Sequence, residues 1–148
     1  VRDLFGAKPE LMFRRTNAYY RSARQCGIAA PARLLWYVKK SSGHIGTKAI
    51  RGYSYLDEVI VGSAKSIFSQ FRHFGIYCWK DVLALTNGRP NDQVMALLFS
   101  YSERFGKPVH FEEVQNTLER WDMPRNQFQS PLRIPAGAFI DIYREGAL

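Results

Sequence analysis

The order of strand-like and helix-like apolar patterns is the sequence feature that most restricts the fold of this chain. Short apolar and aromatic runs bounded by turn residues indicate strands at 32–38, 48–61, 76–85 and 93–101. Helical spacing of apolar residues indicates helices over 64–74 and 111–121, and a short helix is predicted over 14–25. The two kinds of element do not alternate regularly. We therefore predict an α+β fold: a small, curved, mixed or antiparallel β-barrel with two or three helices packed outside it.

The segments between these elements give further expectations. Ser63 is the expected N-cap of the helix over 64–74, because it directly precedes the first apolar turn. Residues 41–46 and 86–92 are rich in glycine, serine and asparagine and are expected to form turns. We expect a connection over 102–107, an irregular proline-containing segment over 123–135, and a short apolar element over 136–143.

The length and cysteine content restrict the class of protein. A chain of 148 residues suits a single domain, here 1–148, with a core of its own. No apolar run approaches the roughly 20 residues that span a bilayer, so no membrane segment is predicted. Cys26 and Cys78 are the only cysteines and indicate no disulfide framework, so we expect reduced thiols and a cytoplasmic location. Because the chain begins at Val1, we expect a processed protein or a fragment of a longer one.

The basic residues are concentrated in the first half of the sequence. The chain has a formal net charge of +8, and no acid occurs between Glu10 and Asp57. Nine basic residues fall in that interval: Arg14, Arg15, Arg21, Arg24, Arg33, Lys39, Lys40, Lys48 and Arg51. A segment of this kind attracts polyanions and speeds their encounter with the protein. The alternative is a solvated basic face that has no partner.

Aromatic residues alternate with these basic residues. They are Tyr19, Tyr20, Trp36, Tyr37, Tyr53 and Tyr55. Basic side chains beside flat rings are typical of surfaces that contact phosphates and stack bases. Each ring taken singly is more often part of a core. The combination favours nucleic acid, RNA or DNA, as the partner.

The motifs of several enzyme and cofactor classes are absent. The sequence has no GxxxxGK[ST] or GxGxxG loop and no GxSxG elbow, which gives no support for nucleotide-dependent chemistry, dinucleotide binding or an α/β-hydrolase site. The histidines and cysteines have no metal-ligand spacing, so no metal site and no cofactor are predicted.

Two local patterns supply candidate catalytic or binding residues. Lys48 and Arg51 follow a glycine turn and point to opposite faces of an extended segment, which would allow one of them to line a pocket while the other lies in solvent. Tyr77 and Trp79 are spaced i, i+2 on the strand predicted over 76–85, so their rings share one face. Lys48, Lys80 and Tyr77 are the catalytic candidates. The alternatives are a phosphate contact or a plain surface charge for Lys48, and core packing for the rings.

Several segments together resemble the PUA-like superfamily, in particular its ASCH and EVE branches. They are RRTNAYY at 14–20, LWYV at 35–38, AIRGYSYLDEV at 49–59, FGIYCWKDV at 74–82, MALLFS at 95–100, RFGKPV at 104–109 and QSP at 129–131. The resemblance covers about residues 14–143. It implies a small curved β-barrel with external helices and a cleft that binds RNA, or DNA and RNA with modified bases.

The resemblance departs from the ASCH pattern at one motif. Where that branch carries Gly-x-Lys-x-x-Glu, the nearest string here is Gly46-Thr47-Lys48-Ala49-Ile50-Arg51, which ends in arginine. Hydrolase or ribonuclease activity, known in some ASCH proteins, is therefore less well supported than binding. The proteins that the chain resembles include modules fused to acetyltransferase or nuclease domains in toxin–antitoxin systems.

The sequence thus predicts a nucleic-acid-binding module. Its expected contacts are Arg14, Arg15, Asn17, Tyr20, Arg21, Arg24, Trp36, Lys39, Lys40, Lys48, Arg51, Tyr77, Trp79 and Gln129. The lysines and arginines would contact phosphates, the rings would stack on bases, and Asn17 and Gln129 would read base edges. Two alternatives remain open. One is a ribonuclease or nucleobase amidohydrolase that uses Lys48 or Lys80 with Tyr77 or Ser54. The other is a toxin–antitoxin component whose basic half binds an acidic protein.

Overall fold

The structure, a computed structural model, describes residues 16–23, 27–39, 48–74 and 77–148. Its α+β fold contains a four-stranded antiparallel sheet in the order β1-β4-β3-β2. The strands are β1 (Thr16–Ser22), β2 (Ala32–Val38), β3 (Ala49–Ser63) and β4 (Gln93–His110). The helices are α2 (Ala64–Phe71), the 3₁₀ turn η1 (Arg72–Phe74), α3 (Trp79–Ala84), α4 (Phe111–Arg120) and α5 (Ala136–Ala147). The described strands leave β1 and β2 as the two sheet edges, so the predicted closed barrel is not confirmed.

The chain divides into two compact units, and two strands pass through both. Unit 1 comprises Val1–Arg33 and Tyr55–Tyr101, and unit 2 comprises Leu34–Ser54 and Ser102–Leu148. Strand β3 enters unit 1 at Tyr55, and β4 enters unit 2 at Ser102. Each unit has a hydrophobic cluster of its own. The expectation of one domain over 1–148 stays a prediction.

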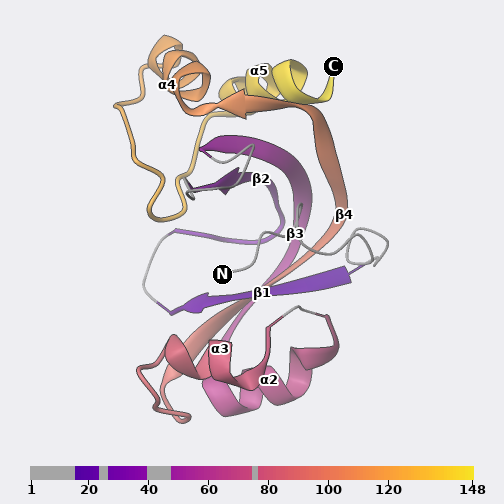
Figure 1. Cartoon of the computed structure of the whole chain (residues 1–148), viewed down its shortest axis with the longest axis vertical. Coiled ribbons are helices and arrows are strands. Elements are labelled where there is room, and N and C mark those ends of the chain that lie inside the picture. Colours follow the sequence, from indigo (N-terminus) through magenta and orange to yellow (C-terminus); the bar gives the residue numbers. More distant parts are fainter. Residues whose placement is uncertain (1–15, 24–26, 40–47, 75–76) are drawn as a thin grey trace. The chain divides into compact units, whose positions relative to one another are not determined.

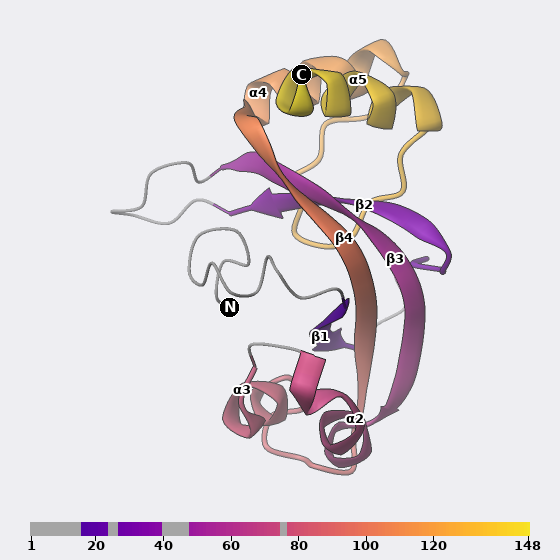
Figure 2. The same cartoon turned by 90° about the vertical axis from the view of Figure 1, so that its right-hand side faces the viewer.

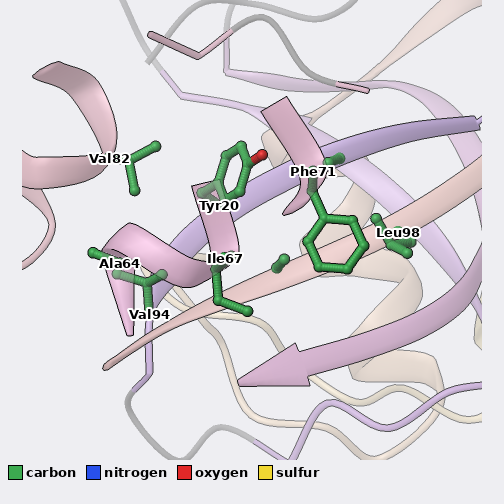
Figure 3. Packing of buried hydrophobic residues seen from close by; sticks show 9 residues of the cluster. Tyr20, Ala64, Ile67, Phe71, Val82, Val94 and Leu98 are labelled. Carbon is green, nitrogen blue, oxygen red and sulfur yellow. The ribbon is translucent and has the colours of Figure 1, made fainter. Parts of the chain in front are cut away.

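Unit 1 is built on β1 and the first half of β4, which pair antiparallel from Thr16↔Ser100 to Ser22↔Val94. Alternate residues of the two strands face the helices, as the twofold period of a strand requires. They meet the apolar side of α2 and the Val82 side chain of α3 (Figure 3). The buried cluster consists of Ala18, Tyr20, Ala64, Ile67, Phe71, Val82, Val94, Ala96 and Leu98.

Helix α2 begins where the sequence predicts. The backbone N–H of Ser66 donates to the Ser63 hydroxyl over 3.2 Å, which confirms Ser63 as the N-cap. Ile67 and Phe71, four residues apart, are buried on one side of the helix. Figure 2 shows α2 and α3 side by side, and residues of the two helices are in contact.

Unit 2 is built on helices α4 and α5, which lie beside the end of β4 in Figure 1. The buried cluster consists of Ile50, Phe105, Val109, Val114, Leu118, Ala138 and Ile142. Two glycines of α5 are needed for close packing. A Cβ on Gly137 would lie 1.9 Å from the Trp121 ring, and one on Gly146 would lie 2.1 Å from the Phe105 ring.

The predicted helix over 14–25 is wrong for residues 16–22, which form β1. Tyr19 and Tyr20 favour strands, but the main determinant is pairing with β4, about 75 residues later along the chain. The local periodicity of the sequence gives no indication of this pairing. The remaining residues of this prediction other than Ala23 lie outside the described residues, as do those of the turn predicted over 41–46.

The strand predicted over 76–85 is also wrong, because residues 79–84 form helix α3. Trp79, Val82 and Leu85 pack against the unit 1 cluster, and their spacing of three is helical rather than extended. The Asp81 carboxylate accepts from the Cys78 backbone N–H over 3.2 Å and caps the first turn.

The C-terminal half contains one further correction. Residues 102–107 are not a connection, because β4 continues through them to His110. Phe105 and Val109 are buried along this part of the strand, although Gly106 and Pro108 are residue types that weaken strands. The helix predicted over 111–121 is confirmed as α4, and the element predicted over 136–143 is the start of α5. None of the helices in the described ranges has the length and hydropathy to span a membrane.

Candidate nucleic-acid interface

The structure divides the expected contact residues between the two units. Unit 1 contains Asn17, Tyr20, Arg21, Tyr77, Trp79 and Lys80, and unit 2 contains Trp36, Lys39, Lys48, Arg51, Ser54 and Gln129. Arg14, Arg15, Arg24 and Lys40 lie outside the described residues.

In unit 1, most of the expected contacts are part of the core. Tyr20 is 2% exposed and Asn17 is 3% exposed. Trp79 lies in helix α3, where its ring centroid is 5.5 Å from that of Phe68. Because Tyr77 precedes the helix and Trp79 begins it, the two rings do not share a strand face. A ring that is covered by its neighbours offers no face to a base, so we omit these residues from the interface.

The two candidate catalytic residues of unit 1 are Tyr77 and Lys80. The Tyr77 ring meets the rings of Tyr19 and Tyr20 edge-on, at centroid distances of 5.7 and 5.4 Å. Burial, followed by the influence of Tyr19, raises the pKa of Tyr77 well above its ordinary value. Burial also raises the pKa of Tyr20 to about 12. Phenols held neutral in this way are poor bases at neutral pH. Lys80 is exposed in α3.

In unit 2, the backbone places Lys48 between two segments that are distant in sequence. Its N–H donates to the Val38 carbonyl over 2.6 Å, and its carbonyl accepts from the Phe111 N–H over 3.0 Å. Lys48 has a φ of 58°, in the left-handed region. The end of β2, the start of β3 and the start of α4 therefore meet at Lys48. Lys39, exposed, directly follows Val38.

Three aromatic rings lie together in unit 2, and the Lys48 ammonium lies over one of them. The Lys48 Nζ lies 4.7 Å from the centroid of the Phe111 ring, a cation–π distance. Phe128 lies 5.9 Å from Phe111 and 4.9 Å from Tyr37 between ring centroids. Gln129 follows Phe128 directly and is exposed. We call this arrangement the Lys48 corner: Lys39, Lys48 and Gln129, with the rings of Tyr37, Phe111 and Phe128.

The loop that carries Gln129 is held by a pair of reciprocal amide hydrogen bonds. Gln115 of α4 is 2% exposed, and its Nε2 donates to the Asn126 carbonyl over 2.6 Å while its Oε1 accepts from the Asn126 N–H over 3.1 Å. The Asn126 Oδ1 then accepts from the Phe128 N–H over 2.7 Å. Phe128 has a φ of 54°. Three hydrogen bonds thus hold the backbone of this loop as far as Phe128, the residue before Gln129.

The acids nearest in sequence to the corner have other partners. Glu112 accepts from the Arg125 guanidinium over 3.2 Å, and Glu113 accepts from the His110 N–H over 3.2 Å. The second interaction caps the first turn of α4. Neither interaction uses Lys48, whose ammonium group is exposed.

A chain of hydrogen bonds crosses three strands elsewhere in unit 2. The Trp36 indole N–H donates to the Ser54 hydroxyl over 2.8 Å, and the Ser54 and Ser102 hydroxyls are 2.7 Å apart. Ser54 is fully buried. These hydrogen bonds link β2, β3 and β4, so the Ser54 hydroxyl has a structural role. Arg51 is half-buried on β3.

Sequence reasoning missed the residues that organise the corner. Tyr37, Phe111 and Phe128 come from three segments, and the Gln115–Asn126 pair joins a helix to an irregular loop. The Asn126-x-Phe128 spacing, typical of an Asx turn, is the local signal that was available. Among the described residues, no group of three or more His, Cys, Asp or Glu is arranged to hold a metal ion.

Comparison with solved structures identifies the fold. ASCH from Zymomonas mobilis is 14% identical, with a TM-score of 0.69 over 92% of this chain and 86% of its own. The chain has the fold of an ASCH domain. A single-residue variant of the same ASCH protein gives a TM-score of 0.71 at 14% identity, over 93% of this chain and 91% of the variant.

A second kind of structure is similar over a shorter range. The N-terminal domain of Staphylothermus marinus McrB, which has a PUA-like fold, is 16% identical, with a TM-score of 0.51 over 77% of this chain and 70% of that one. The resemblance to ASCH and PUA-like proteins seen in the sequence is therefore confirmed for the fold. No protein-family model and no curated protein sequence matches the chain.

Proposed function

We propose that the chain binds nucleic acid, RNA or DNA, through the Lys48 corner. The observation that carries the proposal is the pair of backbone hydrogen bonds that joins Lys48 to Val38, next to Lys39, and to Phe111, whose ring contacts that of Phe128 in the loop of Gln129. Ammonium groups neutralise phosphates and position the ligand, and an amide can both donate to and accept from a base edge.

The charge pattern of the chain supports a polyanionic ligand. Strands β1 and β2 and the first half of β3 all fall within the stretch that contains no acid. The two carboxylates at the start of α4 are engaged with Arg125 and with the helix N-terminus. Neither carboxylate is paired with the Lys48 ammonium, and the excess of basic residues in this part of the sequence favours encounter with phosphates. The ASCH-like fold supports the same class of ligand.

Titration of fluorescent nucleic acids tests the proposal. We would measure the anisotropy of labelled single-stranded RNA, single-stranded DNA and duplex DNA, each at several salt concentrations between 50 and 200 mM. Lys48→Ala should weaken binding and reduce the slope of log K against log salt by about one, because one phosphate contact is lost.

The matched control is Lys65→Ala, which removes an equally exposed lysine from α2 in unit 1. It should leave the salt slope unchanged. The proposal is wrong if no nucleic acid binds, or if Lys48→Ala and Lys65→Ala behave alike. A protein partner that co-purifies after nuclease treatment and high salt would then become the leading alternative.

A further inference from the structure

Unit 1 carries an exposed pair of tyrosine rings that the Lys48 corner does not involve. Tyr55 of β3 is 37% exposed and Tyr101 of β4 is 60% exposed. Their ring centroids are 5.9 Å apart and the rings are nearly perpendicular, at 88°. The Arg33 guanidinium of β2 lies 5.5 Å from the centroid of the Tyr55 ring. We call these three residues the Tyr101 surface.

The backbone at Tyr101 is strained. Its φ is 52°, in the left-handed region that bulky side chains rarely adopt. Burial of the ring does not offset the free-energy cost of this conformation, because Tyr101 is more exposed than Tyr55. Strained residues of this kind cluster at functional sites, where the conformation presents a side chain. Tyr101 is held in an orientation that leaves its ring open to solvent.

The charges around the rings indicate what kind of group they contact. Asp57 follows Tyr55 by two residues on β3 and is exposed on the same face. One guanidinium and one carboxylate give this surface no excess of positive charge. Binding here must therefore come from the rings rather than from neutralised phosphates. Carboxylates such as Asp57 are depleted from the cores of protein interfaces, which favours a small flat group over a protein partner here.

We propose that the Tyr101 surface stacks an unpaired base of a single-stranded nucleic acid. The inference rests on the proposed nucleic-acid binding and adds the strandedness of the ligand, since bases within a duplex are not available to stack on a side chain. Every base has a flat face, so this contact tolerates any sequence. It contributes affinity that is nearly independent of salt, in contrast to Lys48.

The test compares ring removal with ring retention in the whole chain. The probes are a fluorescent single-stranded 12-mer RNA and the same RNA in a duplex, each at 50 and 200 mM salt. Tyr101→Gly removes the ring and also relieves the backbone strain, so the variant keeps its fold. Phe74→Ala is the matched control, because Phe74 is an exposed ring of the same unit, at 39% exposure.

Tyr101→Gly should weaken single-strand binding by about 5- to 140-fold at both salt concentrations, with the salt slope and duplex affinity unchanged. Tyr101→Phe should bind like the unmodified chain. The inference is overturned if Tyr101→Gly binds the single strand normally, or if Phe74→Ala loses as much affinity. If Lys48→Ala still lowers the slope of log K against log salt in that case, the proposed function remains supported and only the inference about Tyr101 is wrong. Absence of binding by the unmodified chain overturns both proposals.

Discussion

Gly146 shows how a single residue determines packing in unit 2. A Cβ at this position would lie 2.1 Å from the Phe105 ring, and Phe105 is only 3% exposed. The buried ring has little room to move aside, so a methyl group here overpacks the core. A glycine inside a helix is otherwise unfavourable, which makes its presence in α5 informative.

Gly146→Ala should therefore lower the free energy of unfolding by about 1–2 kcal/mol, even though alanine is the better helix former. Urea denaturation followed by circular dichroism measures the change. Gly106→Ala is the control, because nothing lies within 4 Å of a Cβ built at Gly106. An unchanged midpoint for Gly146→Ala would show that the Phe105 ring moves freely.

At the scale of elements, the sequence predicts those whose apolar spacing is local. Helices α2 and α4 and strands β2 and β3 follow from such spacing. Strand β1 and helix α3 do not: β1 depends on pairing with β4, and α3 depends on Trp79, Val82 and Leu85 meeting a core assembled from β1, β4 and α2. Tertiary contacts decide the structure of both segments.

The same limit applies to the candidate interface. Lys48 and Gln129 are recognisable from the sequence as a basic and an amide group. The sequence does not show how the two residues are connected. The connection passes through the Phe111 and Phe128 rings, and Gln115 holds the loop by hydrogen bonds to Asn126. Rings such as Tyr20 look suitable for stacking in the sequence, and only their burial shows otherwise.

The Gln115–Asn126 pair gives a prediction for the loop as an element. Gln115→Leu removes both hydrogen bonds and leaves the Asn126 backbone groups without partners, at a cost of about 1–3 kcal/mol. Because Lys39 and Lys48 are retained, the nucleic acid should bind more weakly with an unchanged salt slope. The anisotropy titration measures both quantities.

Asn116→Ala, on the exposed side of α4, is the control for Gln115→Leu and should bind normally. A fall in salt slope for Gln115→Leu would contradict the assignment, because it would mean that the loop positions the lysines. Unchanged affinity would mean that the loop takes no part in binding.

At the scale of the whole molecule, the two units differ in the candidate binding residues that they leave exposed. Unit 1 packs Tyr20 and Tyr77 into its hydrophobic cluster, and unit 2 brings Lys48 against Phe111, which is far from it in the chain. Composition and charge indicate a polyanionic ligand, because they do not depend on which residues meet. The proposed location of the binding surface does depend on that, so it required the structure.

The buried phenol of Tyr20 makes the stability of the molecule depend on alkaline pH. Burial raises its pKa from about 10 to about 12. Since the folded-state pKa is the higher one, the stabilisation is fully present below pH 10 and is lost as the pH rises through 12. The slope approaches about 1.4 kcal/mol per pH unit in that window. The raised pKa of Tyr77 adds to the effect in the same direction.

Tyr20→Phe tests this dependence. In the described part of the chain the buried Tyr20 hydroxyl has no hydrogen-bond partner, so the variant should be as stable as the unmodified protein at pH 7. Between pH 10 and pH 11 its free energy of unfolding should fall less steeply, because one phenol no longer ionises in the unfolded chain. Urea titrations at pH 7, 9, 10 and 11 measure both quantities. Equal slopes for the two proteins would mean that the folded state accommodates the Tyr20 phenolate, and that the space between β1 and α2 is open to water.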